Sequence, residues 1–249
     1  MYENKFKQND EYKQKIDEFR PLSENILAQL KAYYKVSLTY TSNAIEGNSL
    51  TLTETKIIIE DGITIGGKSI REHLEVIGHS DAYDLLYELA NNRKITEKEI
   101  LQLHHLFYKN INEEKAGTYR NCNVIITGSE FELPKHIEIP NLMKEFVAKI
   151  PQIKKNLHPV EFAARLHERL VSIHPFVDGN GRTARLLMNL ALLQAGYNIV
   201  IIPPVVRNDY IYALKEVQLN KNEKPFINFI SEMVLESQKD YLRLINALQ

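Results

Sequence analysis

The chain has 249 residues, of which 44% are hydrophobic, and a formal net charge of −1 at pH 7. These apolar side chains suffice for a sizeable core, which excludes a disordered protein, and the small net charge argues against a general nucleic-acid or anionic-membrane binder. The polar N-terminus resembles neither a signal peptide nor a membrane anchor, and no apolar run could span a bilayer. Because a single cysteine, Cys122, excludes an internal disulfide, we expect a cytoplasmic protein.

The N-terminal part is predicted to be helical. Apolar residues recur at helical spacing over residues 10–40, and Pro21 is expected to start a helix that runs towards Tyr40. The stretch TSNAIEGNSLTLTET then predicts a helix end closed by Gly47, a turn, and a new N-cap at Thr53. On this structural interpretation, Glu46 is an exposed residue near a helix end.

Further helices are predicted up to residue 111. A short amphipathic run ends at Gly62, and Ser69 is expected to cap a long helix. Thr96, with Glu99 three residues later, predicts a capping box at the start of the next helix. No histidine has a partner at metal-ligand spacing such as HExxH, so no histidine metal site is predicted.

One β-hairpin is predicted between Gly117 and Pro134. Residues 124–126 are β-branched, residues 127–129 have turn chemistry, and residues 131–133 would form the returning strand. An isolated hairpin is marginally stable in water, so this one needs support from the helices around it.

The rest of the chain is again predicted to be helical. One helix is expected to end at Pro151, another covers residues 161–172, and a third ends at Gly196. The following IVIIPPV run is expected to be an extended segment packed on the core, because its prolines break ladder pairing. Pro225 is expected to start the last helix.

Residues 174–185, HPFVDGNGRTAR, form a tight loop between two predicted helices. A helix N-terminus offers unpaired N–H groups and partial positive charge, which suit an anion. The glycines of Gly-Asn-Gly permit close backbone approach, Arg182 is expected to start the helix, and Arg185 lies one turn further on. This combination predicts a binding site for a polyphosphate.

Two side chains of the loop have other expected uses. Asp178 would hold a divalent cation that bridges the carboxylate and the phosphates. His174 would act as a base near neutral pH. The plainer interpretation is a glycine-rich loop whose arginines face solvent.

The same residues resemble the signature of the Fic family, HPFx(D/E)GNGRxxR, at every defined position. Fic proteins transfer part of a nucleotide, most often AMP from ATP, onto a hydroxyl side chain of a target protein. The resemblance implies an all-α Fic fold with one β-hairpin flap, with ATP as substrate and Mg²⁺ or Mn²⁺ as cofactor. Residues 1–92 would form an N-terminal helical region and residues 93–249 the catalytic core, in one compact unit.

A second resemblance concerns SNAIEG, residues 42–47, which matches the (S/T)xxxE(G/N) inhibitory motif of Fic proteins. In such proteins the glutamate pairs with the second motif arginine and obstructs the site of the ATP γ-phosphate. A carboxylate facing Arg185 would neutralise the charge meant for phosphate and repel an incoming anion. The inhibitory residues are therefore expected to be Ser42, Glu46 and Gly47.

The predicted hairpin and its preceding GTYRN resemble the Fic flap, which covers the nucleotide and pairs with an extended target segment. A target protein, or the chain itself, would then bind at residues 124–133, and a homo-oligomer is expected from the family. The C-terminal region resembles the part of the family that borders the adenine, although Lys221-Asn222 stands where many relatives have Gly-Asp. The predicted nucleotide-binding residues are Gly179, Asn180, Gly181, Arg182, Arg185, Ile126, Thr127, Gly128, Ser129, Tyr210 and Gln218.

The resemblance thus implies AMP transfer to a Ser, Thr or Tyr hydroxyl, with His174 as base and Glu46 as brake. Three alternatives stay open. The first is hydrolytic removal of AMP, with Glu46 positioning a water molecule. The second is another donor, such as UTP or CDP-choline. The third is a silent binding or toxin–antitoxin-type module, against which the intact motif argues.

Overall fold

A computed structural model describes residues 2–92, 94–128 and 130–249, and within these ranges the regular structure is entirely helical. The α-helices are α1 (Phe6–Asp17), α2 (Glu24–Ile45), α3 (Leu52–Lys56), α4 (Ile70–Ala90), α5 (Glu97–Tyr108), α6 (Ile139–Asn156), α7 (Pro159–Ile173), α8 (Asn180–Gln194), α9 (Arg207–Asn220) and α10 (Lys224–Leu248). Single turns are η1 (Ile57–Asp61), η2 (Glu113–Lys115), η3 (His136–Glu138) and η4 (Pro204–Val206). None of the helices in these ranges has the length and apolarity that crossing a membrane requires.

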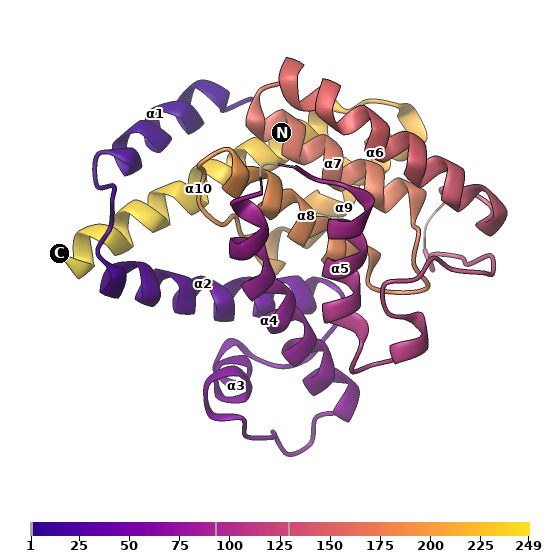
Figure 1. Ribbon diagram of the computed structural model, residues 1–249, viewed down its shortest axis with the longest axis horizontal. Helices are drawn as coiled ribbons and strands as arrows, with labels where there is room; N and C mark the ends of the chain where they lie inside the picture. The colour runs from indigo at the N-terminus through magenta and orange to yellow at the C-terminus, as the bar shows by residue number, and fades with distance from the viewer. Residues whose placement is uncertain (1, 93, 129) are drawn as a thin grey trace.

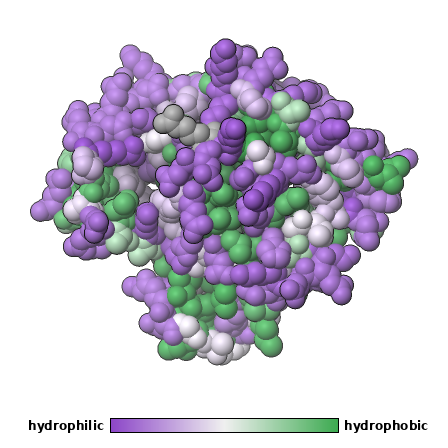
Figure 2. All heavy atoms as spheres, in the orientation of Figure 1, coloured by the Kyte–Doolittle hydropathy of each residue, from purple (hydrophilic) through white to green (hydrophobic). Residues whose placement is uncertain are grey.

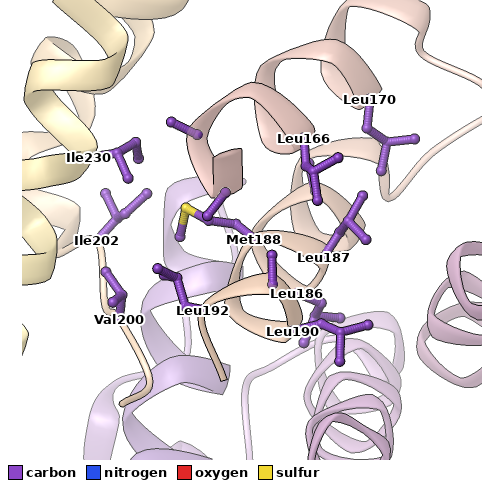
Figure 3. Close-up of a cluster of buried hydrophobic side chains, with 14 of the residues drawn as sticks. Leu166, Leu170, Leu186, Leu187, Met188, Leu190, Leu192, Val200, Ile202 and Ile230 are labelled. Carbon is purple, nitrogen blue, oxygen red and sulfur yellow. The ribbon is translucent and has the colours of Figure 1, made fainter. Parts of the chain in front are cut away.

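Helix α8 lies at the centre of the molecule and packs against α7, α4 and α5 (Figure 1). Its side chains are buried almost all round, as expected for a helix inside a core rather than on its surface. Leu192 and Met188 of α8 lie close to Val200 and Ile202 of the extended segment and to Ile230 of α10, and Leu166 and Leu170 of α7 lie beside Leu187 of α8 (Figure 3). The motif therefore begins a helix that the rest of the fold holds in place.

The chain between α2 and α4 projects from this body as a small lobe made of α3, η1 and the following loop (Figure 1). The lobe has its own small cluster of buried residues, Leu50, Ile58 and Val76. Hydrophobic side chains also lie on the surface of the lobe and of the adjoining start of α4 (Figure 2), where Ile63 is 58% and Ile70 78% exposed.

Local capping signals correctly predicted several helix ends. Capping boxes form at Ser69 with Glu72 and at Thr96 with Glu99. The turn of η1 ends at Gly62, which has a φ of 67°. Each of these helix ends depends on interactions between residues at most three positions apart, so the local sequence is enough to predict it.

Outside the motif, three predicted boundaries were wrong. Helix α2 begins after Ser23, not at Pro21, because the Ser23 hydroxyl accepts the Ile26 N–H at 3.3 Å. Helix α3 is capped by Thr51, not Thr53, since only Thr51 has a glutamate three residues later to complete a capping box.

The third wrong boundary is Pro151, which lies inside α6 rather than at its end. Proline has no N–H, so one helical hydrogen bond is missing. Because Pro151 is exposed, water can reach the carbonyl oxygen that is left without this donor. Burial of Ile150 keeps the helix seated on the core through this point.

The predicted β-hairpin was also wrong. Residues 120–128 and 130–135 contain turns and irregular backbone but no strand. A hairpin needs a buried face, but Val124 and Ile126 are only half-buried and Ile125 is 94% exposed, so this segment has none. Its two ends are instead held by one side chain, because Arg120 donates hydrogen bonds to the carbonyl oxygens of Cys122 at 2.9 Å and Pro134 at 2.5 Å. We keep the name flap for residues 121–134.

Candidate active site

The loop between α7 and α8 is held in a fixed, partly left-handed conformation. His174 ends α7 with φ 53° and ψ 58°, an uncommon region for a residue other than glycine. Gly179 precedes α8 with φ 76°, and a Cβ there would lie 2.6 Å from the Phe107 ring. Position 179 therefore needs glycine for two reasons, its backbone angle and its contact with α5.

Side chains within and beside the loop fix it further. The Asn180 amide accepts from the Phe176 N–H and donates to the Phe176 carbonyl, both at 2.9 Å. The buried Phe176 ring stacks on His104 at 3.7 Å between centroids. Asn180 thus holds the loop geometry with its side chain, which leaves its backbone N–H for an anion.

His104 joins this loop to the segment after α5. Its Nδ1 accepts the Gly117 N–H at 2.9 Å, so its Nε2 carries the proton donated to the Asp178 carbonyl at 3.1 Å. Burial lowers the His104 pKa to about 4, which keeps this neutral tautomer in place near neutral pH.

His174 is a neutral imidazole with one nitrogen available. Burial lowers its pKa to about 4, and the nearby Arg120 guanidinium acts in the same direction. The Nδ1 atom lies 3.4 Å from the Val171 carbonyl, to which Nδ1–H donates. This tautomer leaves the Nε2 lone pair free to accept a proton.

Helix α8 begins at Asn180, two residues before the expected Arg182. The first intrahelical bond runs from the Thr183 N–H to the Gly179 carbonyl at 2.9 Å, so the preceding N–H groups of α8 lie ahead of the hydrogen-bond ladder. Together with the helix dipole, these N–H groups beside His174 suit an anion.

The first motif arginine, Arg182, is buried among groups of both charges. Its guanidinium lies 3.0 Å from Glu75 and 3.1 Å from Asp178, and 4.5 Å over the Phe107 ring. Asp178 also pairs with Arg71 of α4, and one of its oxygens accepts the Gly179 N–H at 2.6 Å. The predicted metal ligand and the first arginine are thus already paired with side chains of the N-terminal region.

The second motif arginine, Arg185, has only 2% of its side chain exposed and is paired with α2. It donates to the Glu46 carboxylate at 2.8 Å, and to the Ser42 hydroxyl at 2.9 Å and carbonyl at 2.8 Å. Burial of Glu46 favours its neutral form, but Arg185 and Arg182 outweigh this and lower its pKa. Glu46 is therefore an ionised partner of Arg185.

Glu46 also lies against the start of α8. A Cβ added to Gly181 would collide with the Glu46 Oε1 atom. The carboxylate thus occupies the space over the glycine where a phosphate would approach. Gly47, which follows with φ 97°, ends α2 and lets the chain turn away at this point.

The remaining predicted nucleotide residues divide into three groups. Gln218 lines a cavity of about 220 Å³ between α7, α9 and the flap. Tyr210 is buried behind Arg185, which donates to its hydroxyl at 3.2 Å. The flap residues Ile126, Thr127 and Gly128 are half-buried or exposed, and Ser129 lies outside the described residues.

Sequence reasoning missed four residues of this site, which are Arg71, Glu75, His104 and Arg120. Each lies 54 to 107 positions before the motif residue that it contacts, so only folding brings the two together. Arg120 contacts His174, Arg71 and His104 contact Asp178, and Glu75 contacts Arg182. The one available signal was GTYRN, whose arginine proves to be the flap anchor. Its guanidinium also donates to the His174 carbonyl at 2.9 Å.

Comparisons with known proteins agree with this geometry. Residues 94–192 match the model of the Fic/DOC family. A solved fragment of Fic-1 from C. elegans is 31% identical, with a TM-score of 0.85 over 98% of this chain and 72% of the fragment. A Fic domain containing signaling protein from Bacteroides thetaiotaomicron is 28% identical, with a TM-score of 0.85 over 97% of this chain and 98% of that one. The chain therefore belongs to the Fic family, as its motif indicated.

A curated relative, protein adenylyltransferase Fic from Nematostella vectensis, is 39% identical over 207 residues, which is 82% of this chain and 48% of the relative. The chain thus spans about half the length of this relative. The shared half includes the residues that the family signature defines.

Proposed function

We propose that the protein is an adenylyltransferase that moves AMP from ATP to a Ser, Thr or Tyr hydroxyl of a target protein. The observation that carries this proposal is the neutral His174 beside a helix N-terminus whose two arginines are buried. A base and a polyphosphate site side by side suit nucleotidyl transfer to a hydroxyl. The Nematostella relative, a protein adenylyltransferase by name, supports the same activity.

In this mechanism His174 Nε2 takes the hydroxyl proton as the oxygen attacks the α-phosphorus. The bond between that phosphorus and the bridging oxygen breaks, and pyrophosphate leaves. Arg182 and the N–H groups that begin α8 stabilise the departing charge. Asn180 holds the loop so that base and anion site keep their relative positions.

Asp178 is the proposed ligand of Mg²⁺ or Mn²⁺. No group of three or more acidic, His or Cys residues suited to a metal lies within the described ranges, so the protein alone forms no cage. One carboxylate fits Mg²⁺ where substrate phosphates and water complete its coordination. The metal, when bound, neutralises charge on the phosphates. Arg71 would have to release Asp178 for this.

Glu46 is the proposed inhibitory residue. Its carboxylate pairs with Arg185 and lies over Gly181, so it obstructs an incoming γ-phosphate both by charge and by volume. ATP would bind productively once Glu46 moves away.

The flap is the proposed docking site for the target. Residues 124–128 and 130–133 have no backbone partner strand in the described structure, so an extended target segment could pair with them. A second copy of the chain is a further expected partner, and the exposed Ile63 and Ile70 offer an apolar surface for it.

The test is incubation of wild type, Glu46→Gly and Glu46→Gly/His174→Ala with Mg²⁺ and ATP labelled at the α-phosphate. Label would be followed on the protein itself and on a cell lysate. We expect strong labelling by Glu46→Gly alone. Labelling by the double variant at the rate of Glu46→Gly would refute His174 as base, and ATP binding without labelling by any variant would favour another donor or removal of AMP.

A further inference from the structure

The cavity that Gln218 lines is a candidate site for the nucleobase, and one of its residues has no assigned role. It lies directly before the motif, since Ser172 and Ile173 form part of its wall, and Phe131 and Pro134 of the flap form another part. Its volume of about 220 Å³ suits a single planar ring system. Phe131, Pro134, Leu142, Ile173 and Val217 give its lining apolar surface against which a ring could pack, and the polar groups between them would determine which base binds.

Glu168 of α7 is the carboxyl group in this lining that has no partner. The other, Glu223, has an oxygen 2.5 Å from the Arg165 guanidinium. The neighbouring ammonium, Lys221, donates to the Gln218 carbonyl at 3.1 Å and lies 5.7 Å from the Phe131 ring. Among the described residues, none makes a hydrogen bond or ion pair with Glu168.

The surroundings of Glu168 favour its neutral form. Burial, followed by repulsion from Glu223, raises its pKa to about 7. The cations that face it, namely Arg165 and Arg169 of its own helix and Lys221 after α9, only partly oppose this. Leu142 of α6, on the remaining side, carries no charge. An unpaired carboxyl that is half-protonated near neutral pH can present either of two hydrogen-bonding patterns.

We propose that Glu168 selects the nucleobase, its carboxyl hydrogen-bonding the Watson–Crick edge of adenine from the wall of this cavity. The inference rests on the proposed nucleotide transfer, since it concerns which base the transferred nucleotide carries. The neutral carboxyl has one O–H donor and one carbonyl acceptor, which complement the N1 acceptor and N6 amino donor of adenine.

The ionised carboxylate has acceptors only. It complements guanine, whose N1–H and N2 amino group are both donors, and it leaves adenine N1 without a donor. Base preference should therefore change with the protonation of Glu168, towards adenine below pH 7 and towards guanine above it. Mismatched buried hydrogen bonds of this kind change affinity by about tenfold or more.

The experiment measures ATP and GTP affinities, with Mg²⁺, at pH 6 and pH 8. Glu46→Gly is the parent protein, so that the phosphate site is open. It is compared with Glu46→Gly/Glu168→Gln and with the control Glu46→Gly/Glu161→Gln, which makes the same chemical change on α7 outside the cavity. Phosphate protonation affects both nucleotides equally, so it cancels in the ratio of the two affinities.

In the parent and the Glu161 control, we expect the preference for ATP over GTP to fall about tenfold from pH 6 to pH 8. Glu168→Gln, whose amide keeps one donor and one acceptor, should abolish this change. An invariant ratio in the parent, or the same change in Glu168→Gln, would overturn the role of Glu168 while nucleotide binding itself supports the proposed function. Failure of every variant to bind either nucleotide would overturn both.

Discussion

The Tyr210 hydroxyl accepts a 3.2 Å hydrogen bond from Nη1 of Arg185. The same hydroxyl donates to Nε2 of the buried His167 at 3.0 Å, because burial holds the His167 pKa well below its normal value and keeps the ring neutral. Arg185 is thus held from α9 and α7 as well as by Glu46. When Glu46 leaves, Tyr210 and His167 would keep the guanidinium aimed at the phosphate site.

We therefore predict that Tyr210→Phe weakens ATP binding several-fold in the Glu46→Gly background. The change removes the hydrogen bond from the charged Arg185 and the one to His167, and it should cost about 2 to 3 kcal/mol of stability. The matched control is Tyr212→Phe, whose ring is 60% exposed. Titration calorimetry with ATP would show the difference, and equal affinities in the two variants would exclude this role for Tyr210.

Arg120 connects the flap to the catalytic loop. Its side chain is buried and donates to three carbonyl oxygens, those of His174, Cys122 and Pro134. Arg120→Lys keeps the charge, but one ammonium group cannot reproduce three bonds spread over a planar fork. We predict faster amide hydrogen exchange in residues 121–134 and a slower transfer step, by about tenfold or more.

The control for this prediction is Arg243→Lys, at a surface residue that pairs with Asp240. Mass-spectrometric hydrogen exchange would be compared between the two variants, together with kcat and KM for ATP in the Glu46→Gly background. Unchanged exchange in the flap of Arg120→Lys would contradict the anchoring role.

What the sequence predicted correctly was local. The caps at Ser69 and Thr96 depend on neighbours three residues away, and the 174–185 motif places its own loop between two helices. The pairing of Glu46 with Arg185 spans 139 residues and was expected only from the family resemblance. Spacing in the sequence carries no such information.

The incorrect predictions have physical reasons that only packing reveals. The flap residues have the β-branched pattern of a strand, but a pattern cannot show that Ile125 faces solvent and that the segment lacks a supporting face. Similarly, Arg71 and Glu75 are ordinary residues of α4 by sequence. They become part of the site only because α4 packs along α8.

Buried neutral histidines predict lower stability at mildly acidic pH. Burial lowers the pKa of His79 to about 3, whereas in the unfolded chain a histidine titrates near 6.5. Between these values the unfolded state binds a proton that the folded state does not, so stability falls as the pH falls below about 6.5. From pH 7 to pH 5 this one group should cost about 2 kcal/mol.

The measurement is urea unfolding at pH 7 and pH 5. His79→Gln should lose about 2 kcal/mol less than wild type over this interval, and the same change at the exposed His105 is the matched control. Glu168 acts in the opposite direction, because its raised pKa adds stability as the pH falls, but this term is common to all three proteins and cancels. Equal losses in all three would contradict the prediction.

Gly78 of α4 packs directly against the backbone of α5 at Phe107. A Cβ at this position would collide with the Phe107 carbonyl oxygen and lie 2.8 Å from its carbon, and backbone atoms cannot move aside as a flexible side chain can. Gly78→Ala should therefore push the two helices apart. The Phe107 ring also contacts Gly179 and Arg182, so the displacement would reach the motif.

We predict that Gly78→Ala lowers the free energy of unfolding by about 3 kcal/mol, the upper part of the range for overpacked cores. For a chain of this size, that loss corresponds to a fall in Tm of about 6 to 12 °C. Gly66→Ala is the matched control, because nothing lies within 4 Å of its added Cβ. It should be neutral or slightly stabilising, since alanine reduces the entropy of the unfolded chain. Calorimetry of the two variants decides the matter, and a Tm for Gly78→Ala equal to that of Gly66→Ala would show that α4 and α5 can separate without cost.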